Sequence, residues 1–120
     1  MVYYSFKAHK YSILIMTEKK FLNGIGDNAL TQLKILGENI REARMARNFT
    51  QEELATRSLM SKSTYISVEK GEPKTSIGAY LAVLDLLDLL DGLQDIAAPH
   101  KDEIGRRYRA FKRNKGASNV

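Results

Sequence analysis

The stretch TQEELATRSLMSKSTYISVEKG, residues 50–71, decides the fold because it predicts two short helices joined by a brief connection. Thr50 and Glu53 form a capping box, in which the threonine hydroxyl accepts a hydrogen bond from the Glu53 amide and the glutamate side chain reaches back. The first helix is therefore expected over residues 50–57, and its inward-facing residues are Leu54 and Ala55.

The second helix is predicted to open at Ser61, a good N-cap residue, and to run to Glu69. Tyr65 and Val68 lie three positions apart and form its expected buried edge. Gly71 follows at the position where a left-handed residue commonly ends a helix. Two short helices with this spacing are typical of a helix-turn-helix, whose second helix lies in the major groove of DNA.

The outward flank of the second helix should be polar and mostly small if it is to approach base edges. Lys62, Ser63, Ile66 and Ser67 occupy that flank. Ile66 either touches a thymine methyl group or is simply an exposed apolar residue. The free amides at the start of either helix offer further phosphate contacts.

A longer helix is predicted before this motif, over residues 27–47, with Asp27 or Asn28 as its cap. Its apolar residues recur at spacings of three or four: Leu30, Leu33, Leu36, Ile40 and Ala43. Arg41, Arg44 and Arg47 should share one solvent-facing side, either as phosphate contacts or as an ordinary solvated face.

An apolar helix capped by Thr75 or Ser76 is predicted over residues 76–87, and a further short helix over residues 89–97. This region holds too many leucines for one face of a small domain, which favours a homodimer interface. The residues expected there are Leu86, Leu87, Leu89, Leu90 and Leu93. A two-fold dimer would place two recognition helices about one DNA turn apart on a palindromic operator.

The remaining segments are the two ends of the chain. Residues 1–26 are expected to form a loosely ordered N-terminal arm, unless Met16 is the natural start and the preceding residues are an upstream extension. Residues 27–98 are the expected DNA-binding and dimerisation domain. Residues 99–120 form a basic C-terminal tail, within which residues 102–115 are either a last helix or a mobile segment.

Charge is unevenly distributed along this chain, whose formal net charge is +5. One cation and five acids give residues 72–100 a net charge of −4, and seven cations and two acids give residues 101–120 a net charge of +5. Asp85, Asp88, Asp91 and Asp95 are read as a solvated or partner-facing acidic stripe rather than a metal site, because no histidine or cysteine joins them.

Other functional classes find little support in the sequence. There is no cysteine, no apolar run of about 20 residues that could span a membrane, and no nucleophile–base pair. His9 and His100 each stand in a weak context. We therefore expect a soluble, cytoplasmic, non-enzymatic protein without metal or cofactor.

The order of these signals resembles the Cro and phage-repressor class of helix-turn-helix regulators over about residues 34–97. The resemblance implies an all-α five-helix bundle that dimerises. LGENIREAR at residues 36–44, EKGEP at 69–73 and DEIG at 102–105 are more narrowly similar to HipB-like antitoxins, which accompany HipA-type kinase toxins. This implies a repressor of its own operon that also holds a kinase toxin in a complex.

The resemblance also implies roles for individual residues. Gln51 would contact a phosphate and buttress the second helix, Ser61 would cap and contact the DNA backbone, and Lys70 would add charge. The expected DNA-binding residues are thus Arg41, Gln51, Ser61, Lys62, Ser63, Ile66, Ser67 and Lys70. Leu59 stands where relatives often carry glycine in the turn, and Asp88 where a glycine often ends the fourth helix. An alternative is an interaction module that mainly neutralises the toxin, with DNA binding secondary.

Overall fold

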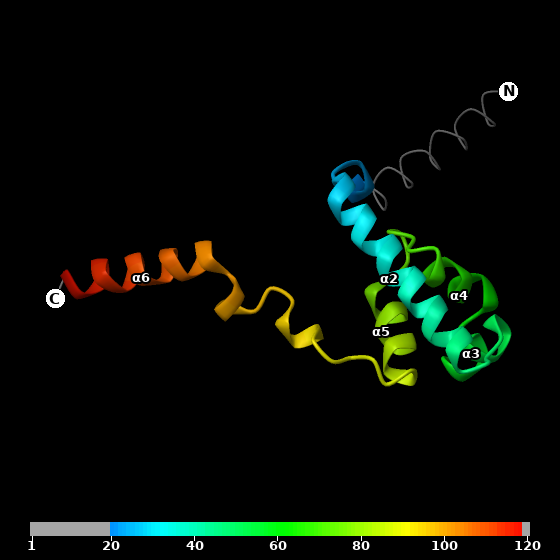
Figure 1. Ribbon diagram of the computed structural model, residues 1–120. Helices are drawn as coiled ribbons and strands as arrows, with labels where there is room; N and C mark the ends of the chain where they lie inside the picture. The colour runs from blue at the N-terminus through cyan, green and yellow to red at the C-terminus, as the bar shows by residue number, and fades with distance from the viewer. Residues whose placement is uncertain (1–19, 119–120) are drawn as a thin grey trace, which may run out of the picture. The chain divides into compact units, whose positions relative to one another are not determined.

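A computed structural model describes residues 20–118, which contain five α-helices, three short 3-10 helices and no strand (Figure 1). The fold is therefore all-α, as predicted. The expectations for residues 1–19, including the start at Met16, lie outside the described residues. The chain divides between Leu87 and Asp88 into two units. Each unit is described separately.

The first unit contains η1 (Lys20–Asn23), α2 (Asp27–Ala46), α3 (Gln51–Arg57), α4 (Lys62–Glu69) and α5 (Ile77–Leu86). The four α-helices match those predicted within a residue or two at each end. The cap of α2 is a correction, because Gly26 occupies the N-cap position without a side-chain hydrogen bond, so neither Asp27 nor Asn28 caps it.

Hydroxyl caps begin the three shorter helices as the sequence indicated. Thr50 Oγ1 accepts from the Glu53 amide at 3.1 Å, Ser61 Oγ from the Thr64 amide at 3.2 Å, and Ser76 Oγ from the Ala79 amide at 3.2 Å. Each cap satisfies an amide that has no partner within its helix. Of the two candidates for α5, Ser76 is the cap.

The core lies around α4, which packs against α2, α3 and α5 (Figure 1). Its fully buried members include Leu54, Tyr65 and Val68, as expected from the spacing. The buried apolar residues of the first unit are Ile40, Leu54, Ala55, Tyr65, Val68, Tyr80, Val83, Leu84 and Leu87. Burial of the inner face of α4 fixes the direction of its opposite face.

The middle of α2 and the C-terminal end of α4 approach each other so closely that two positions require glycine. A Cβ atom on Gly37 would collide with the backbone oxygen of Glu69, and one on Gly71 would collide with the backbone oxygen of Leu33. Gly71 also has φ +65°, the left-handed cap predicted for the end of this helix.

The turn between α3 and α4 has the unusual backbone that its sequence indicated. Leu59 has φ 55°, a left-handed conformation that a side-chain-bearing residue adopts at an energetic cost. Its side chain is 95% exposed, so no apolar burial offsets that cost. Asp88 also has a left-handed backbone, with φ 58°.

The second unit corrects the predicted helix over residues 89–97. Only η2 (Leu93–Asp95) forms there, because Asp88 and Gly92 both take left-handed backbone angles and leave too few residues between them for an α-helix. η3 (Pro99–Lys101) and α6 (Glu103–Ser118) follow. Of the two alternatives for residues 102–115, the helix is the one that forms.

Within residues 20–118, no helix combines the length and apolar character needed to cross a membrane.

Candidate nucleic-acid interface

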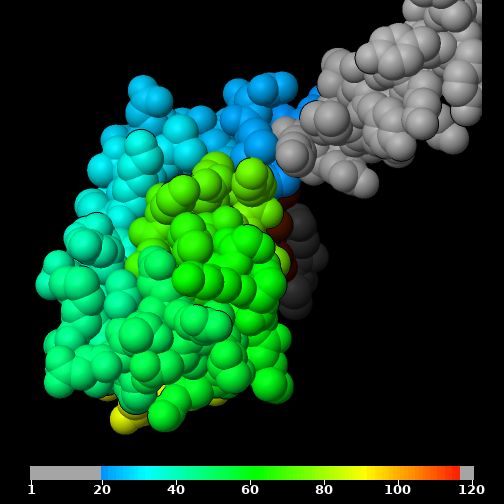
Figure 2. All heavy atoms as spheres, turned by 90° about the vertical axis from the view of Figure 1, so that its right-hand side faces the viewer, coloured from blue at the N-terminus to red at the C-terminus, as the bar shows by residue number. Residues whose placement is uncertain are grey.

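The outward flank of α4 carries the residues that the sequence assigned to DNA. Lys62, Ser63 and Lys70 are exposed, and Ile66 and Ser67 are partly exposed. On the opposite edge Tyr65, Val68 and Glu69 are buried. Figure 2 shows the face on which this part of the chain, in green, lies open to solvent. The helix thus presents a polar flank along its whole length.

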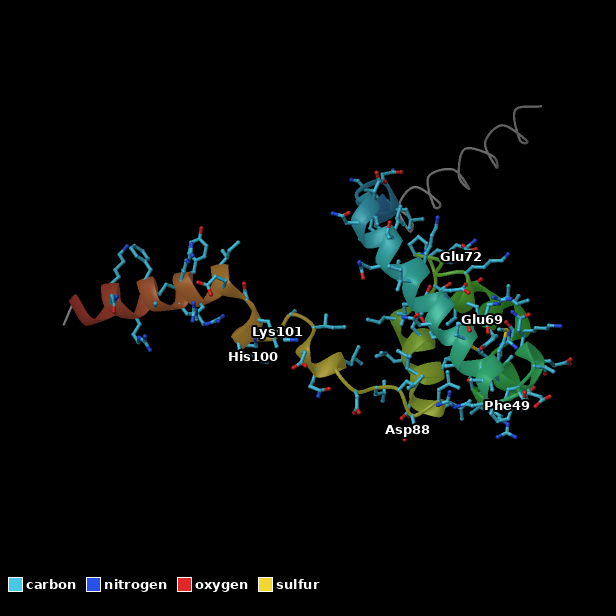
Figure 3. All side chains as sticks on the ribbon, viewed as in Figure 1. Phe49, Glu69, Glu72, Asp88, His100 and Lys101 are labelled. Atoms are coloured by element: carbon cyan, nitrogen blue, oxygen red, sulfur yellow. The ribbon has the colours of Figure 1, made fainter. Side chains whose placement is uncertain are left out.

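A buried carboxylate holds α4 in place from its inner edge. Glu69 is 8% exposed and accepts hydrogen bonds from three residues (Figure 3). Arg44 donates through Nε at 2.5 Å and Nη2 at 3.4 Å, Tyr65 through its hydroxyl at 2.7 Å, and Gln51 through Nε2 at 2.8 Å. These bonds join α2, α3 and α4 at one point. We call Arg44, Gln51, Tyr65 and Glu69 the Glu69 cluster.

Electrostatics within the Glu69 cluster favour the charged carboxylate. Burial alone would raise the pKa of Glu69, but the hydrogen bonds donated to it, foremost from Arg44, hold the pKa below its ordinary value. Burial and the neighbouring carboxylate raise the pKa of Tyr65 well above its usual range. The hydrogen bond to Glu69 raises the pKa of Arg44, so the pair remains ionised.

The three arginines of α2 do not share one solvent-facing side, which is a correction. The Arg44 side chain is only 11% exposed, and its Nη1 donates to the Phe49 carbonyl at 2.8 Å besides pairing with Glu69. Arg47 donates to the carbonyls of Ala43 and Leu87, at 2.8 Å and 3.0 Å. Arg41 and Arg47 are nevertheless exposed, as predicted, and Arg41 pairs with Glu38 at 3.2 Å.

Gln51 lies where α3 meets α4, beside a shallow hollow of about 440 Å³. Its bond to Glu69 supplies the buttress expected for the second helix. The lining of the hollow is rich in cations and amide or carboxylate groups: Lys34, Glu38, Arg41, Gln51, Ile66, Glu69 and Lys70. Lys34 was missed in the sequence, although it precedes Arg41 by two helical turns and therefore shares its face.

A second hollow, of about 380 Å³, lies on the other side of α4. Its lining consists of hydroxyl groups and one cation: Ser63, Thr64, Ser67, Lys74, Thr75 and Ser76. Ser67 Oγ donates to the Ser63 carbonyl at 3.1 Å, so that hydroxyl is oriented along the helix. Lys74 and Thr75 were not among the predicted DNA-binding residues, because the sequence places Lys74 in a loop and offers Thr75 only as a helix cap.

The leucines expected at a dimer interface differ in exposure. Leu86 and Leu89 are 43% and 42% exposed, and Leu90 and Leu93 are partly exposed. Leu87 is only 3% exposed and belongs to the core of the first unit. It is therefore removed from the candidate interface, and the other four remain predictions.

Comparisons with known proteins agree with this geometry. Residues 40–90 match the family model described as Helix-turn-helix. No curated protein and no solved structure matched the chain. The matched region contains α3 and α4 together with the last part of α2 and all of α5. The match of residues 40–90 therefore supports a helix-turn-helix of the Cro and repressor type and a DNA-binding role in transcription regulation.

Proposed function

We propose that the chain is a sequence-specific repressor that inserts α4 into the major groove of its operator. The observation that carries this proposal is the two-sided character of α4, whose polar flank is open while Tyr65, Val68 and Glu69 are buried. Lys62, Ser63, Ile66 and Ser67 read bases or adjacent phosphates at the start and middle of the helix. A DNA-bound homodimer then blocks polymerase sterically at its own promoter, in the cytoplasm and without a cofactor.

Phosphate contacts fix the register of α4 in the groove. We assign them to Ser61 at the helix start and to Gln51, Arg41 and Lys70 beside the 440 Å³ hollow. Lys34 joins this group because it lines the same hollow. The cationic lining supports an anionic occupant, and duplex DNA supplies phosphates along the path of a recognition helix.

A salt-titrated binding assay on the DNA upstream of the gene tests this proposal. Lys62→Ala should weaken binding and reduce the slope of log K against log salt by about one. Ser63→Ala should weaken binding to the operator more than to scrambled DNA. Lys101→Ala, in the second unit, is the matched control and should leave both quantities unchanged. Equal wild-type affinity for operator and scrambled DNA would contradict sequence-specific repression.

We further propose that the repressor is the antitoxin of a HipA-like kinase, which rests on the resemblance of its flanking motifs to HipB-like regulators. Co-expression with a kinase encoded beside the gene should give a co-purifying complex and relieve toxicity. Lys62→Ala combined with Ser63→Ala should abolish operator binding and leave neutralisation intact. Full neutralisation without any operator binding by the wild type would favour the alternative, an interaction module in which DNA binding is secondary.

A further inference from the structure

Helix α6 presents an apolar stripe that is largely exposed in the part of the chain that the structure describes. Ile104, Tyr108 and Phe111 lie at intervals of four and three residues, so they share one helix face. They are 68%, 66% and 65% exposed, and they line a hollow of about 530 Å³ together with Arg107. We call these three residues the α6 stripe. Anchors at this spacing are typical of a helix that docks into another protein surface.

The charge on α6 restricts what can cover the stripe. The helix carries six cations, Arg106, Arg107, Arg109, Lys112, Arg113 and Lys115, and one acid, Glu103, so its net charge is +5. Two α6 helices would repel each other, which disfavours a symmetric pairing of the stripes. Duplex DNA would satisfy the cations but would leave three large apolar side chains without an apolar partner. The occupant must therefore be acidic and apolar at once.

The chain itself contains such a surface. Residues 85–96, which we call the acidic segment, hold four aspartates and no cation, a net charge of −4. Their exposed apolar residues are Leu86, Leu89 and Ile96, which are 43%, 42% and 71% exposed. The acidic segment thus offers both the charge and the apolar area that the α6 stripe lacks.

Some of these charged residues already form ion pairs, which reduces the number that are available for a contact between α6 and the acidic segment. Asp95 lies 3.7 Å from His100 Nε2 and 3.7 Å from Lys101 Nζ, so its charge is partly used next to α6 (Figure 3 labels His100 and Lys101). Glu103 pairs with Arg106 at 2.5 Å and with Arg107 at 3.4 Å, near the start of the helix. Asp85 and Asp91 are exposed, and so is Lys112 beside the stripe.

We infer that α6 of one copy docks on the acidic segment of a second copy, and that the same contact occurs in reverse. In a two-fold dimer this reciprocal contact forms twice. The inference rests on the proposed dimeric repressor and specifies how its two subunits are joined. The dimer contact is tested by the oligomeric state, whereas the repressor function is tested by the DNA titration. Failure of one proposal can therefore be distinguished from failure of the other.

The first test compares two neighbouring cations by analytical ultracentrifugation of the full chain. Lys112 flanks the stripe, whereas Arg113 follows Ile104 by nine residues and therefore lies on the opposite face of the helix. Lys112→Glu should raise the dimer Kd about tenfold or more, because it places like charges together. Arg113→Glu makes the same change in net charge and should have little effect. Equal effects of both variants would overturn the inference.

The second test uses a charge exchange between two variants. One carries Arg107→Glu and Lys112→Glu in α6, and the other carries Asp85→Lys and Asp91→Lys in the acidic segment. Each alone should be a monomer, because like charges then meet at both contacts. An equimolar mixture should form a heterodimer, because both contacts become complementary.

Circular dichroism should show unchanged helix content in these variants, since all four positions are exposed. A wild-type monomer, or a mixture that stays monomeric, would overturn the inference. The first of these is also the outcome if α6 covers the acidic segment of its own chain. The wild type could instead be a monomer that binds duplex DNA or anionic vesicles. If Lys112→Glu then abolishes one of these two interactions, the α6 stripe is assigned to that ligand.

Discussion

Removing Arg44 should destabilise the domain strongly, because it leaves a buried carboxylate without its main partner. The Arg44 and Glu69 side chains are 11% and 4% exposed, so solvent replaces little of the lost interaction. Breaking a buried ion pair on one side costs about 3–5 kcal/mol. Tyr65 and Gln51 continue to donate to Glu69, which favours the lower end, about 3 kcal/mol.

The measurement is a double-mutant cycle with Arg44→Met, Glu69→Gln and the combined variant, each unfolded both in urea and by heat near neutral pH. Arg44→Met should lower the Tm by about 12–24 °C, at about 4–8 °C for each kcal/mol. The combined variant no longer contains a buried unpaired charge. The free energy of unfolding that the combined variant loses should therefore be about 2 kcal/mol smaller than the sum of the losses in the two single variants.

The exposed pair Arg41 and Glu38 provides the matched control, because its side chains are 46% and 58% exposed. The same cycle there, with Arg41→Met and Glu38→Gln, should give a coupling of at most about 0.5 kcal/mol. Lowering the pH toward the ordinary pKa of glutamate should narrow the gap between wild type and Arg44→Met, since protonated Glu69 needs no cation. Additive losses in the Glu69 cluster, or equal couplings at both pairs, would refute the reasoning.

Three further outcomes follow from the backbone and the Glu69 cluster. Leu59→Gly should raise the free energy of unfolding by about 0.5–1 kcal/mol in urea titrations, since glycine adopts φ 55° without strain; a loss of stability would contradict the strained turn. Gly71→Ala should lower the Tm in thermal unfolding, because its Cβ would meet the Leu33 backbone. The raised pKa of Tyr65 stabilises the fold below about pH 10, the ordinary tyrosine value, and this stability should decline as the pH rises above it. Tyr65→Phe should flatten that decline, and an unchanged pH profile would exclude Tyr65 as its source.

The local parts of the fold could be predicted because they depend on neighbouring residues. The caps at Thr50, Ser61 and Ser76 follow from hydroxyl residues that precede helical patterns, and the left-handed Gly71 follows from its place after Val68 and Glu69. The buried residues of α4 follow from the helical period alone.

The tertiary contacts could not be predicted in the same way. A row of arginines at intervals of three reads as a solvated face, yet the Arg44 side chain is only 11% exposed because it pairs with the buried Glu69 of α4. Leucine spacing suggested a helix over residues 89–97, but two left-handed residues in that region prevent it. Leu87 looked like its neighbours in sequence, and only the packing of α5 separates it from them.

The Glu69 cluster holds α4, the proposed recognition helix, against α2 and α3 before any DNA is present. A helix held at its far end by three hydrogen bonds, donated to one carboxylate by Arg44 of α2 and Gln51 of α3, loses little conformational entropy when it docks. Association should then resemble the meeting of two rigid bodies, fast and with little reorganisation of the protein. A variant that loosens the Glu69 cluster would keep every residue proposed to contact bases. It would still bind DNA more weakly, because the conformational entropy of ordering α4 would then be lost on binding.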